Sequence, residues 1–193
     1  MNHLRFVQMS GVPGAGKTTV AHAIAGSINA VVIDHDVTKS ALLEADVPVA
    51  LAGRASYMVL DAIASHLLKQ GHSVIFDSPC MYEELLIRGQ KLASEMGAQY
   101  RYVECVIHDL DELDRRLSTR PRMRSQLAGV YAPPTEGSGK TALGANTFRA
   151  WIANMKRPTD SYLVLDTARP LAICTKEAIS YIETGRLMER SEG

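Results

Sequence analysis

The sequence lacks the features that would assign it to a specialised class of protein. Its 193 residues include only three cysteines, Cys80, Cys105 and Cys174, which are widely spaced and form no Cys-x-x-Cys pair. This pattern argues against a disulfide framework and a zinc site, and fits the reducing cytosol. No apolar run approaches the roughly 18 residues of a membrane-spanning helix. The chain enters its first apolar run without a charged leader, so we expect a cytoplasmic protein.

An excess of charge of either sign is also missing. Lys plus Arg and Asp plus Glu each number 21, so the formal net charge at pH 7 is zero. Proteins that bind nucleic acids or anionic membranes usually carry an excess of basic residues. The balance therefore argues against both partners, although it allows a local basic groove. The composition, 46% apolar and 22% charged, is that of an ordinary globular protein, and we predict one domain over residues 1–193.

A complete phosphate-binding loop, Gly-x-x-x-x-Gly-Lys-Thr, occupies residues 11–18. It lies between an apolar run at 4–9, predicted to be a strand, and a helix predicted at 17–28. The glycines let successive N–H groups turn toward the phosphates of a nucleotide, and the helix directs its positive end at the same anion. Lys17 would then reach the β- and γ-phosphates, and Thr18 would ligate Mg²⁺. The predicted nucleotide-binding residues are Gly11, Pro13, Gly14, Ala15, Gly16, Lys17, Thr18 and Thr19.

Four further apolar runs alternate with helical patterns, which is typical of an α/β fold. The strands are predicted at 30–33, 73–77, 100–107 and 162–166, and the later helices at 38–45, 54–70, 85–96, 109–120, 148–156 and 175–184. We therefore predict a P-loop NTPase with a five-stranded parallel sheet and helices on both faces, similar to nucleoside monophosphate kinases. The helix at 54–70 is expected to bury Ala55, Met58, Val59, Ala62, Ile63, His66 and Leu67.

Composition changes at residues 128–146, which include two prolines and four glycines. With few large apolar side chains, this stretch is not expected to form a packed layer, and we predict a mobile lid at about residues 121–146. Gly139-Lys140-Thr141 imitates a second phosphate loop, but Pro134 stands where the first glycine is needed. We interpret this match as accidental, although Lys140 could approach a phosphate when the lid closes.

Asp77 ends the strand predicted at 73–77, at the edge of the sheet where the phosphate loop also lies. A carboxylate there is suited to anchor Mg²⁺ together with Thr18, although the aspartate could simply begin a turn. Ser78 follows it, whereas motor and helicase ATPases generally place a glutamate there to activate water. Hydrolysis is thus disfavoured. The chain also lacks the Asn-Lys-x-Asp run that reads guanine, so ATP is the expected nucleotide.

If water is not the acceptor, the γ-phosphoryl passes to a hydroxyl, whose proton a carboxylate can receive. Asp36 is the candidate base. Extended alternation would put Asp34 on the same side, where it could contact the magnesium-bound water or the substrate, and would turn His35 away. The alternatives are two turn aspartates that cap the next helix, or a metal cluster, which the orientation expected of His35 disfavours.

Three arginines could supply the remaining positive charge. Arg116 and Arg120 are spaced i, i+4 just before the predicted lid, so they are expected to share one helix face. There they could clamp the transferred phosphoryl group or stack on adenine. Arg157, followed by a proline, is a third candidate. Each could instead be a solvated surface residue.

The order of these motifs resembles the AAA_33 group of small P-loop kinases over about residues 4–184. The matching runs are Gly-x-Pro-Gly-x-Gly-Lys-Thr, Asp-x-Asp-Val-x-Lys, Val-Ile-x-Asp-Ser-Pro, Arg-Leu-x-x-Arg, Arg-Pro and Val-Leu-Asp-Thr. Relatives of that shape include chloramphenicol phosphotransferase, zeta toxins, gluconate and shikimate kinases and polynucleotide kinase domains. The resemblance implies transfer of phosphate from ATP to a hydroxyl, with Asp36 matching the catalytic aspartate. It also matches Lys17, Thr18, Arg116 and Arg120 to nucleotide-site residues. Residues 47–57 match no single member's substrate pocket.

We therefore expect a kinase that uses ATP and Mg²⁺ to phosphorylate a small hydroxyl-bearing molecule, such as an antibiotic, a sugar or another metabolite. Two alternatives belong to other classes. A kinase acting on a polynucleotide 5′-hydroxyl would need clustered Lys and Arg for the phosphate backbone. A nucleotide-dependent switch protein would hydrolyse ATP slowly. Release of ADP that depends strictly on an acceptor would separate the kinases from the switch.

Overall fold

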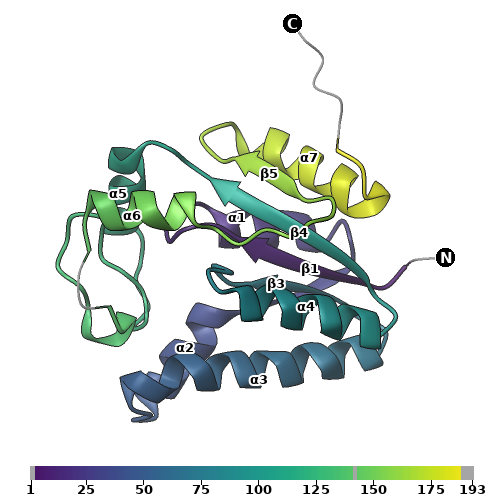
Figure 1. Ribbon diagram of the computed structural model, residues 1–193, viewed down its shortest axis with the longest axis horizontal. Coiled ribbons are helices and arrows are strands. Elements are labelled where there is room, and N and C mark those ends of the chain that lie inside the picture. Colours follow the sequence, from purple (N-terminus) through teal and green to yellow (C-terminus); the bar gives the residue numbers. More distant parts are fainter. Residues whose placement is uncertain (1–2, 141–142, 188–193) are drawn as a thin grey trace, which may run out of the picture.

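The computed structural model describes residues 3–140 and 143–187. Each strand is followed along the chain by one or more helices (Figure 1). The strands are β1 (Arg5–Ser10), β2 (Ala30–Asp34), β3 (Ser73–Asp77), β4 (Gln99–Val106) and β5 (Leu163–Asp166). The α-helices are α1 (Lys17–Ala25), α2 (His35–Glu44), α3 (Val49–Lys69), α4 (Glu83–Glu95), α5 (Leu110–Thr119), α6 (Ala145–Ala153) and α7 (Leu171–Thr184), and a short 3₁₀ helix, η1, covers Glu136–Ser138.

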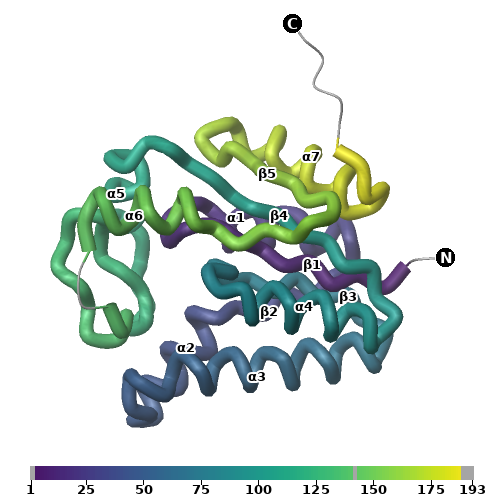
Figure 2. Tube along the Cα trace, viewed as in Figure 1, coloured from purple at the N-terminus to yellow at the C-terminus, as the bar shows by residue number. Residues whose placement is uncertain are grey.

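The five strands of the described residues form one parallel sheet, as predicted, and their order in it is β2-β3-β1-β4-β5. The chain moves from β1 toward β2 and β3 on one side, and then crosses to β4 and β5 on the other. Ligands of open α/β sheets bind beyond the carboxyl ends of strands where the order reverses. That point lies at the end of β1, and α2, α5 and α6 gather at this edge of the sheet (Figure 2). No helix in the described part of the chain is long and apolar enough to cross a membrane.

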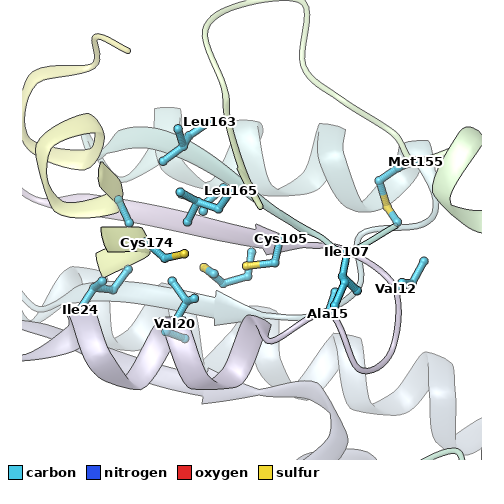
Figure 3. Close-up of a cluster of buried hydrophobic side chains, with 14 of the residues drawn as sticks. Val12, Ala15, Val20, Ile24, Cys105, Ile107, Met155, Leu163, Leu165 and Cys174 are labelled. Carbon is cyan, nitrogen blue, oxygen red and sulfur yellow. The ribbon is translucent and has the colours of Figure 1, made fainter. Parts of the chain in front are cut away.

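Helices cover both faces of the sheet, as the sequence predicts. On one face α1 and α7 pack against β1, β4 and β5, and Val20, Ile24, Cys105, Leu165 and Cys174 meet in this core (Figure 3). On the other face α3 and α4 cover a second core that is centred on aromatic and branched side chains of β1 and β3. All three cysteines are buried and free, and the sequence pattern argues against a disulfide framework.

The prediction of which α3 residues are buried is wrong: the buried positions are shifted by about one residue along the sequence. The helix starts at Val49, earlier than predicted, and buries Ala52, Ser56, Leu60, Ala64 and Leu68 at a regular spacing of four. Met58, Val59, Ile63 and His66 are exposed instead, and the His66 ring contacts Gln70. Both stripes of this helix are apolar, so hydrophobicity alone does not distinguish them. The stripe with small side chains allows the closer approach to α2 and to the sheet.

The predicted lid is partly packed. Leu127 and Val130 are buried in the main core, and the Asp114 carboxylate accepts hydrogen bonds from the backbone N–H groups of Val130 and Tyr131. Residues 128–146 are not expected from the sequence to form a packed layer, but Val130 of this stretch does belong to the core. Thr141, part of the imitation phosphate loop, lies outside the described residues. The mobility of the lid stays a prediction.

Candidate active site

The phosphate loop connects β1 to α1 and has the conformation that its glycines permit. Gly11, Gly14 and Gly16 all have positive φ angles, of 129°, 85° and 87°. A side chain at Gly11 would also overlap the carbonyl oxygen of Cys105, so only glycine fits there. The Lys17 ammonium donates hydrogen bonds to the carbonyl oxygens of Gly11 (2.9 Å) and Val12 (3.1 Å) and thus lies over the loop.

Thr18 and Asp77 come together from neighbouring elements, although they are 59 residues apart in the sequence. The Thr18 hydroxyl donates a 2.6 Å hydrogen bond to Oδ2 of Asp77, which ends β3 beside β1. Oδ1 of Asp77 is buried and has no hydrogen-bond partner among the described residues. Burial raises the pKa of Asp77 to about 6, although the charge of Lys17 opposes this shift. A hydroxyl beside a carboxylate with an unpaired oxygen is a donor set that fits Mg²⁺.

The structure corrects the expected arrangement of Asp34, His35 and Asp36. Helix α2 begins directly at His35, three residues earlier than predicted, so the alternation of an extended strand does not apply. Asp34 caps this helix, and its Oδ1 accepts hydrogen bonds from the N–H groups of Asp36 (2.6 Å) and Val37 (3.3 Å). Burial and the charge of Asp36 raise the pKa of Asp34. The capping role was an open alternative, and it holds for Asp34.

His35 does not point away into solvent. Its ring is buried, stacks on Tyr57 with centroids 4.2 Å apart, and places Nδ1 3.6 Å from Oδ1 of Asp36. The other oxygen of Asp36 accepts a 2.9 Å hydrogen bond from the Gln126 amide. Burial alone would raise the pKa of Asp36, but His35, Gln126 and the charge of Lys17 together hold it at about 2. Asp36 is therefore ionised at neutral pH. Within the described residues no group of three metal-binding side chains occurs.

The three candidate arginines differ in their surroundings. Arg116 donates to Oε1 of Glu112 (2.7 Å) and to the carbonyl oxygen of Thr167 (3.0 Å), which ties α5 to the loop after β5. Arg120 lies just beyond the end of α5, so the two do not share a helix face. Burial lowers the pKa of Arg120, and its Nε has no partner among the described residues.

Arg157 lies elsewhere. Its guanidinium makes a bidentate ion pair with the buried carboxylate of Glu104, at 2.6 and 2.9 Å. This pair holds the chain before β5 against β4, and Arg157 is absent from the walls of both clefts described below. The sequence predicts that Arg157 binds the nucleotide, but in this structure it pairs with Glu104 outside the phosphate-loop cleft.

Two clefts adjoin at the carboxyl edge of the sheet. The first, here the phosphate-loop cleft, has a volume of about 650 Å³ and runs from the phosphate loop to the loop after β5. The second, here the α3 cleft, has a volume of about 840 Å³ and lies between α2, α3, the start of α4 and residues 125–140. The residues that line both are Pro13, His35, Asp36, Pro79 and Arg120.

Most of the predicted site residues line the phosphate-loop cleft: Pro13, Gly14, Gly16, Lys17, Thr18, Thr19, Asp34, Asp36, Asp77, Arg116 and Arg120. Gly11 and Ala15 are buried behind it. Sequence reasoning missed Thr167 and Arg169 in the same cleft, although Thr167 directly follows the Asp166 that ends β5, and the rule for strand ends indicates this position. It also missed Lys39, Tyr57 and Gln126 in the α3 cleft, where only the tertiary structure joins them.

Solved structures share this fold. The Mycobacterium tuberculosis APS kinase CysC, in complex with AMPPNP and APS, is 22% identical with a TM-score of 0.67, over 94% of this chain and 99% of that one. A sugar kinase from Janibacter sp. HTCC2649 is 18% identical with a TM-score of 0.62, and the match covers 93% of this chain and 95% of that one. A gluconokinase from Sinorhizobium meliloti 1021 is 18% identical with a TM-score of 0.59, and the match covers 93% of this chain and 91% of that one.

A search of curated proteins finds no match. The family model described as AAA domain, AAA_33, matches residues 6–130, which is more than half of the chain. The matched segment contains the phosphate loop, Asp36, Asp77 and both arginines that follow β4 and line the phosphate-loop cleft. The chain therefore belongs to the AAA_33 family of AAA domains.

Proposed function

We propose that the protein is a kinase that transfers the γ-phosphoryl group of ATP to a hydroxyl of a small molecule. The observation that carries this proposal is the junction of two clefts at Asp36 and Arg120. One cleft is built on a phosphate loop, and the other is large enough for a metabolite. A protein that only hydrolyses or senses a nucleotide needs no second cleft at that point.

The phosphate-loop cleft provides the groups that phosphoryl transfer requires. Lys17, which bonds to loop carbonyl oxygens in this structure, would turn to the β- and γ-phosphates once a nucleotide is bound. Thr18 and Asp77 would hold Mg²⁺, which neutralises and orients those phosphates. Arg120 lines the same cleft, where its guanidinium would stabilise the charge that develops on the transferred group.

Asp36 faces the acceptor. Because its pKa is about 2, the ionised carboxylate can accept a hydrogen bond from the acceptor hydroxyl and align it with the γ-phosphorus. The acceptor oxygen forms its bond to phosphorus, the bond between phosphorus and the bridging oxygen of ADP breaks, and the hydroxyl proton passes to Asp36. So acidic a carboxylate takes the proton late, after the new bond has made the hydroxyl strongly acidic.

Ser78 and Pro79 follow Asp77, so no carboxylate stands there to activate water. Solved structures of similar fold support the same proposal, since they include an APS kinase, a sugar kinase and a gluconokinase. Each is similar in fold to this chain, at 22% identity or less.

The proposal is tested by incubating the protein with ATP, Mg²⁺ and pools of small hydroxyl compounds. Mass spectrometry should find an acceptor that gains one phosphate, and ADP release should depend on that acceptor. Lys17→Ala should abolish the transfer and leave the circular dichroism spectrum unchanged, because the Lys17 side chain is only partly buried and is not part of the hydrophobic core. ADP release at the same rate with and without every acceptor would instead support a hydrolase or switch. Transfer to an oligonucleotide 5′-hydroxyl alone would support the polynucleotide kinase.

A further inference from the structure

The α3 cleft holds positive charge that its own residues do not balance, although the whole chain is neutral. Its acidic residues are Asp36 and Glu84. Its basic residues are Lys39, Arg54, Arg88, Arg120 and Lys140. Arg88 is paired with Asp61, but within residues 3–140 and 143–187 the other four form no ion pair. A cleft with excess charge of one sign concentrates ligands of the opposite sign.

Two of these cations come from segments far apart in the sequence. Lys39 lies on α2, is 9% exposed, and donates one 3.1 Å hydrogen bond to the carbonyl oxygen of Ser138. Lys140 follows two residues after Ser138 and places its ammonium 5.0 Å from the centroid of the Trp151 ring. Burial lowers the pKa of Lys39, Asp36 opposes this shift, and the charge of Lys140 adds to it. The fold thus brings together two like charges that repel each other.

A purely structural role explains this pair poorly. An ammonium group has three donors, and the bond to Ser138 uses one of them. Burying a lysine that no carboxylate of the described residues contacts is costly even with Asp36 one helical turn away, and a second cation nearby adds to that cost. An anion between the two ammonium groups would remove both penalties. The two lysines line the α3 cleft and not the phosphate-loop cleft, so the phosphates of the nucleotide are not that anion.

The position of Lys39 also sets a distance. It follows Asp36 by three residues on α2, so the two side chains leave the same face about one helical turn apart, a rise of roughly 4.5 Å. We propose that the acceptor carries an anionic group, a carboxylate, sulfate or phosphate, which Lys39 and Lys140 bind about one helical turn from the hydroxyl that is phosphorylated. That the bound anion belongs to the acceptor rests on the proposed function. The existence of the anion site does not.

The site can be tested without turnover, because Trp151 is the only tryptophan of the chain and Lys140 lies over its ring. The phosphate-loop cleft is first filled with AMPPNP and Mg²⁺. Sulfate is then titrated at constant ionic strength, and binding is followed by tryptophan fluorescence and by calorimetry. We expect saturable binding that weakens about tenfold in both Lys39→Gln and Lys140→Gln, since each removes a charge-assisted hydrogen bond.

Two controls make this result specific. Lys39→Arg keeps the charge and should bind sulfate nearly as well as the unaltered protein, which separates loss of charge from loss of fold. Lys69→Gln removes the same charge from an exposed lysine at the other end of α3, and should change nothing. Absence of saturable binding in both readouts, or an equal loss in Lys69→Gln, overturns the anion site.

A second experiment tests the link to the acceptor. Hydroxyl compounds are offered in pairs that differ only in a carboxylate or the corresponding carboxamide. The carboxylate member should be the better substrate, and Lys140→Gln should raise its KM about tenfold while the KM for ATP stays constant. Equal or better turnover of the carboxamide overturns the inference and leaves the proposed kinase standing. Sulfate binding as described, with no acceptor of either kind phosphorylated, removes the kinase and leaves the anion site.

Discussion

The Gln126 amide donates a 2.9 Å hydrogen bond to Oδ2 of Asp36 across 90 residues of sequence. Gln126 belongs to the segment predicted to be a lid, and its Oε1 accepts a bond from the N–H of Met123 in the same segment. This side chain therefore connects the predicted lid segment to Asp36, the carboxylate proposed to face the acceptor. Movement of the predicted lid and the charge of Asp36 are therefore expected to affect each other.

Replacing Gln126 should move the acid limb of the pH–activity profile to higher pH. Gln126→Leu removes one of the contacts that hold the pKa of Asp36 at about 2, and a bond to a charged group is worth roughly one pKa unit or more. Gln126→Glu removes the same donor and adds a negative charge, so it should raise the pKa of Asp36 further. At saturating ATP and Mg²⁺, which keep Asp77 ionised, the profile of kcat/KM for the acceptor against pH should shift upward in that order, with circular dichroism recorded at each pH. The same acid limb in all three proteins would show that Asp36 does not control activity.

The burial of Asp77 predicts an unusual dependence of stability on pH, because it outweighs the opposing hydrogen bond from Thr18. The folded pKa of Asp77 is raised to about 6 from an ordinary value of 3.8, so the unfolded chain ionises first as pH rises. Stability is therefore lost between about pH 4 and pH 6, and the penalty is complete above pH 6. Asp77→Asn should remove it and stabilise the protein by roughly 2–3 kcal/mol at pH 8 without Mg²⁺.

Urea unfolding of both proteins measures this difference, which should vanish below about pH 4, where the unaltered carboxyl group is protonated in both states. Addition of Mg²⁺ with nucleotide should then stabilise the unaltered protein more than Asp77→Asn, because only the carboxylate can hold the metal tightly. A variant that is less stable at pH 8 and equally responsive to Mg²⁺ would contradict both roles.

Two glycines provide a matched pair of alanine substitutions. Gly11→Ala places a side chain at φ 129° and against the Cys105 carbonyl oxygen, so it should destabilise the protein by roughly 3 kcal/mol or more. Gly53→Ala lies inside α3, where no atom comes within 4 Å of the added carbon, and should stabilise by about 0.5–1 kcal/mol. Thermal unfolding of both variants checks the opposite signs. Similar changes in the two would show that the loop tolerates another conformation.

Most of the fold could be predicted from the sequence because it depends on local signals. β3 coincides with its prediction at residues 73–77, since a short β-branched run between a helix-ending glycine and an aspartate has few other interpretations. The phosphate loop has its expected conformation because its glycines have no close substitute. In contrast, the start of α2 could not be predicted. The side chains of Asp34 and Thr38 can both cap a helix, so the sequence allows the helix to begin after either residue.

The α3 cleft is beyond sequence analysis for a different reason. Lys39, Tyr57, Gln126 and Lys140 come from three separate segments, and nothing in their local patterns shows that they meet. The α3 face shows the same limit, because two apolar stripes compete and only the packing partner selects one. Local patterns thus locate the nucleotide side of the site, while the acceptor side needs the tertiary structure.

The last prediction separates the two carboxylates at the start of α2. Asp36→Asn keeps the shape of the side chain and can still orient a hydroxyl, but it cannot take the proton, so turnover should fall about 10²–10⁴-fold with little change in ATP affinity. Asp34 makes its observed bonds to the N–H groups of Asp36 and Val37, so it acts by capping α2 and positioning Asp36. Asp34→Asn keeps most of that cap and should lose less activity, by about tenfold at most. Single-turnover rates at saturating acceptor, together with nucleotide affinity measured by calorimetry, distinguish these outcomes. If Asp34→Asn is the more damaging change and Asp36→Asn keeps near-normal turnover, the base is Asp34 and the roles given to the two residues are reversed.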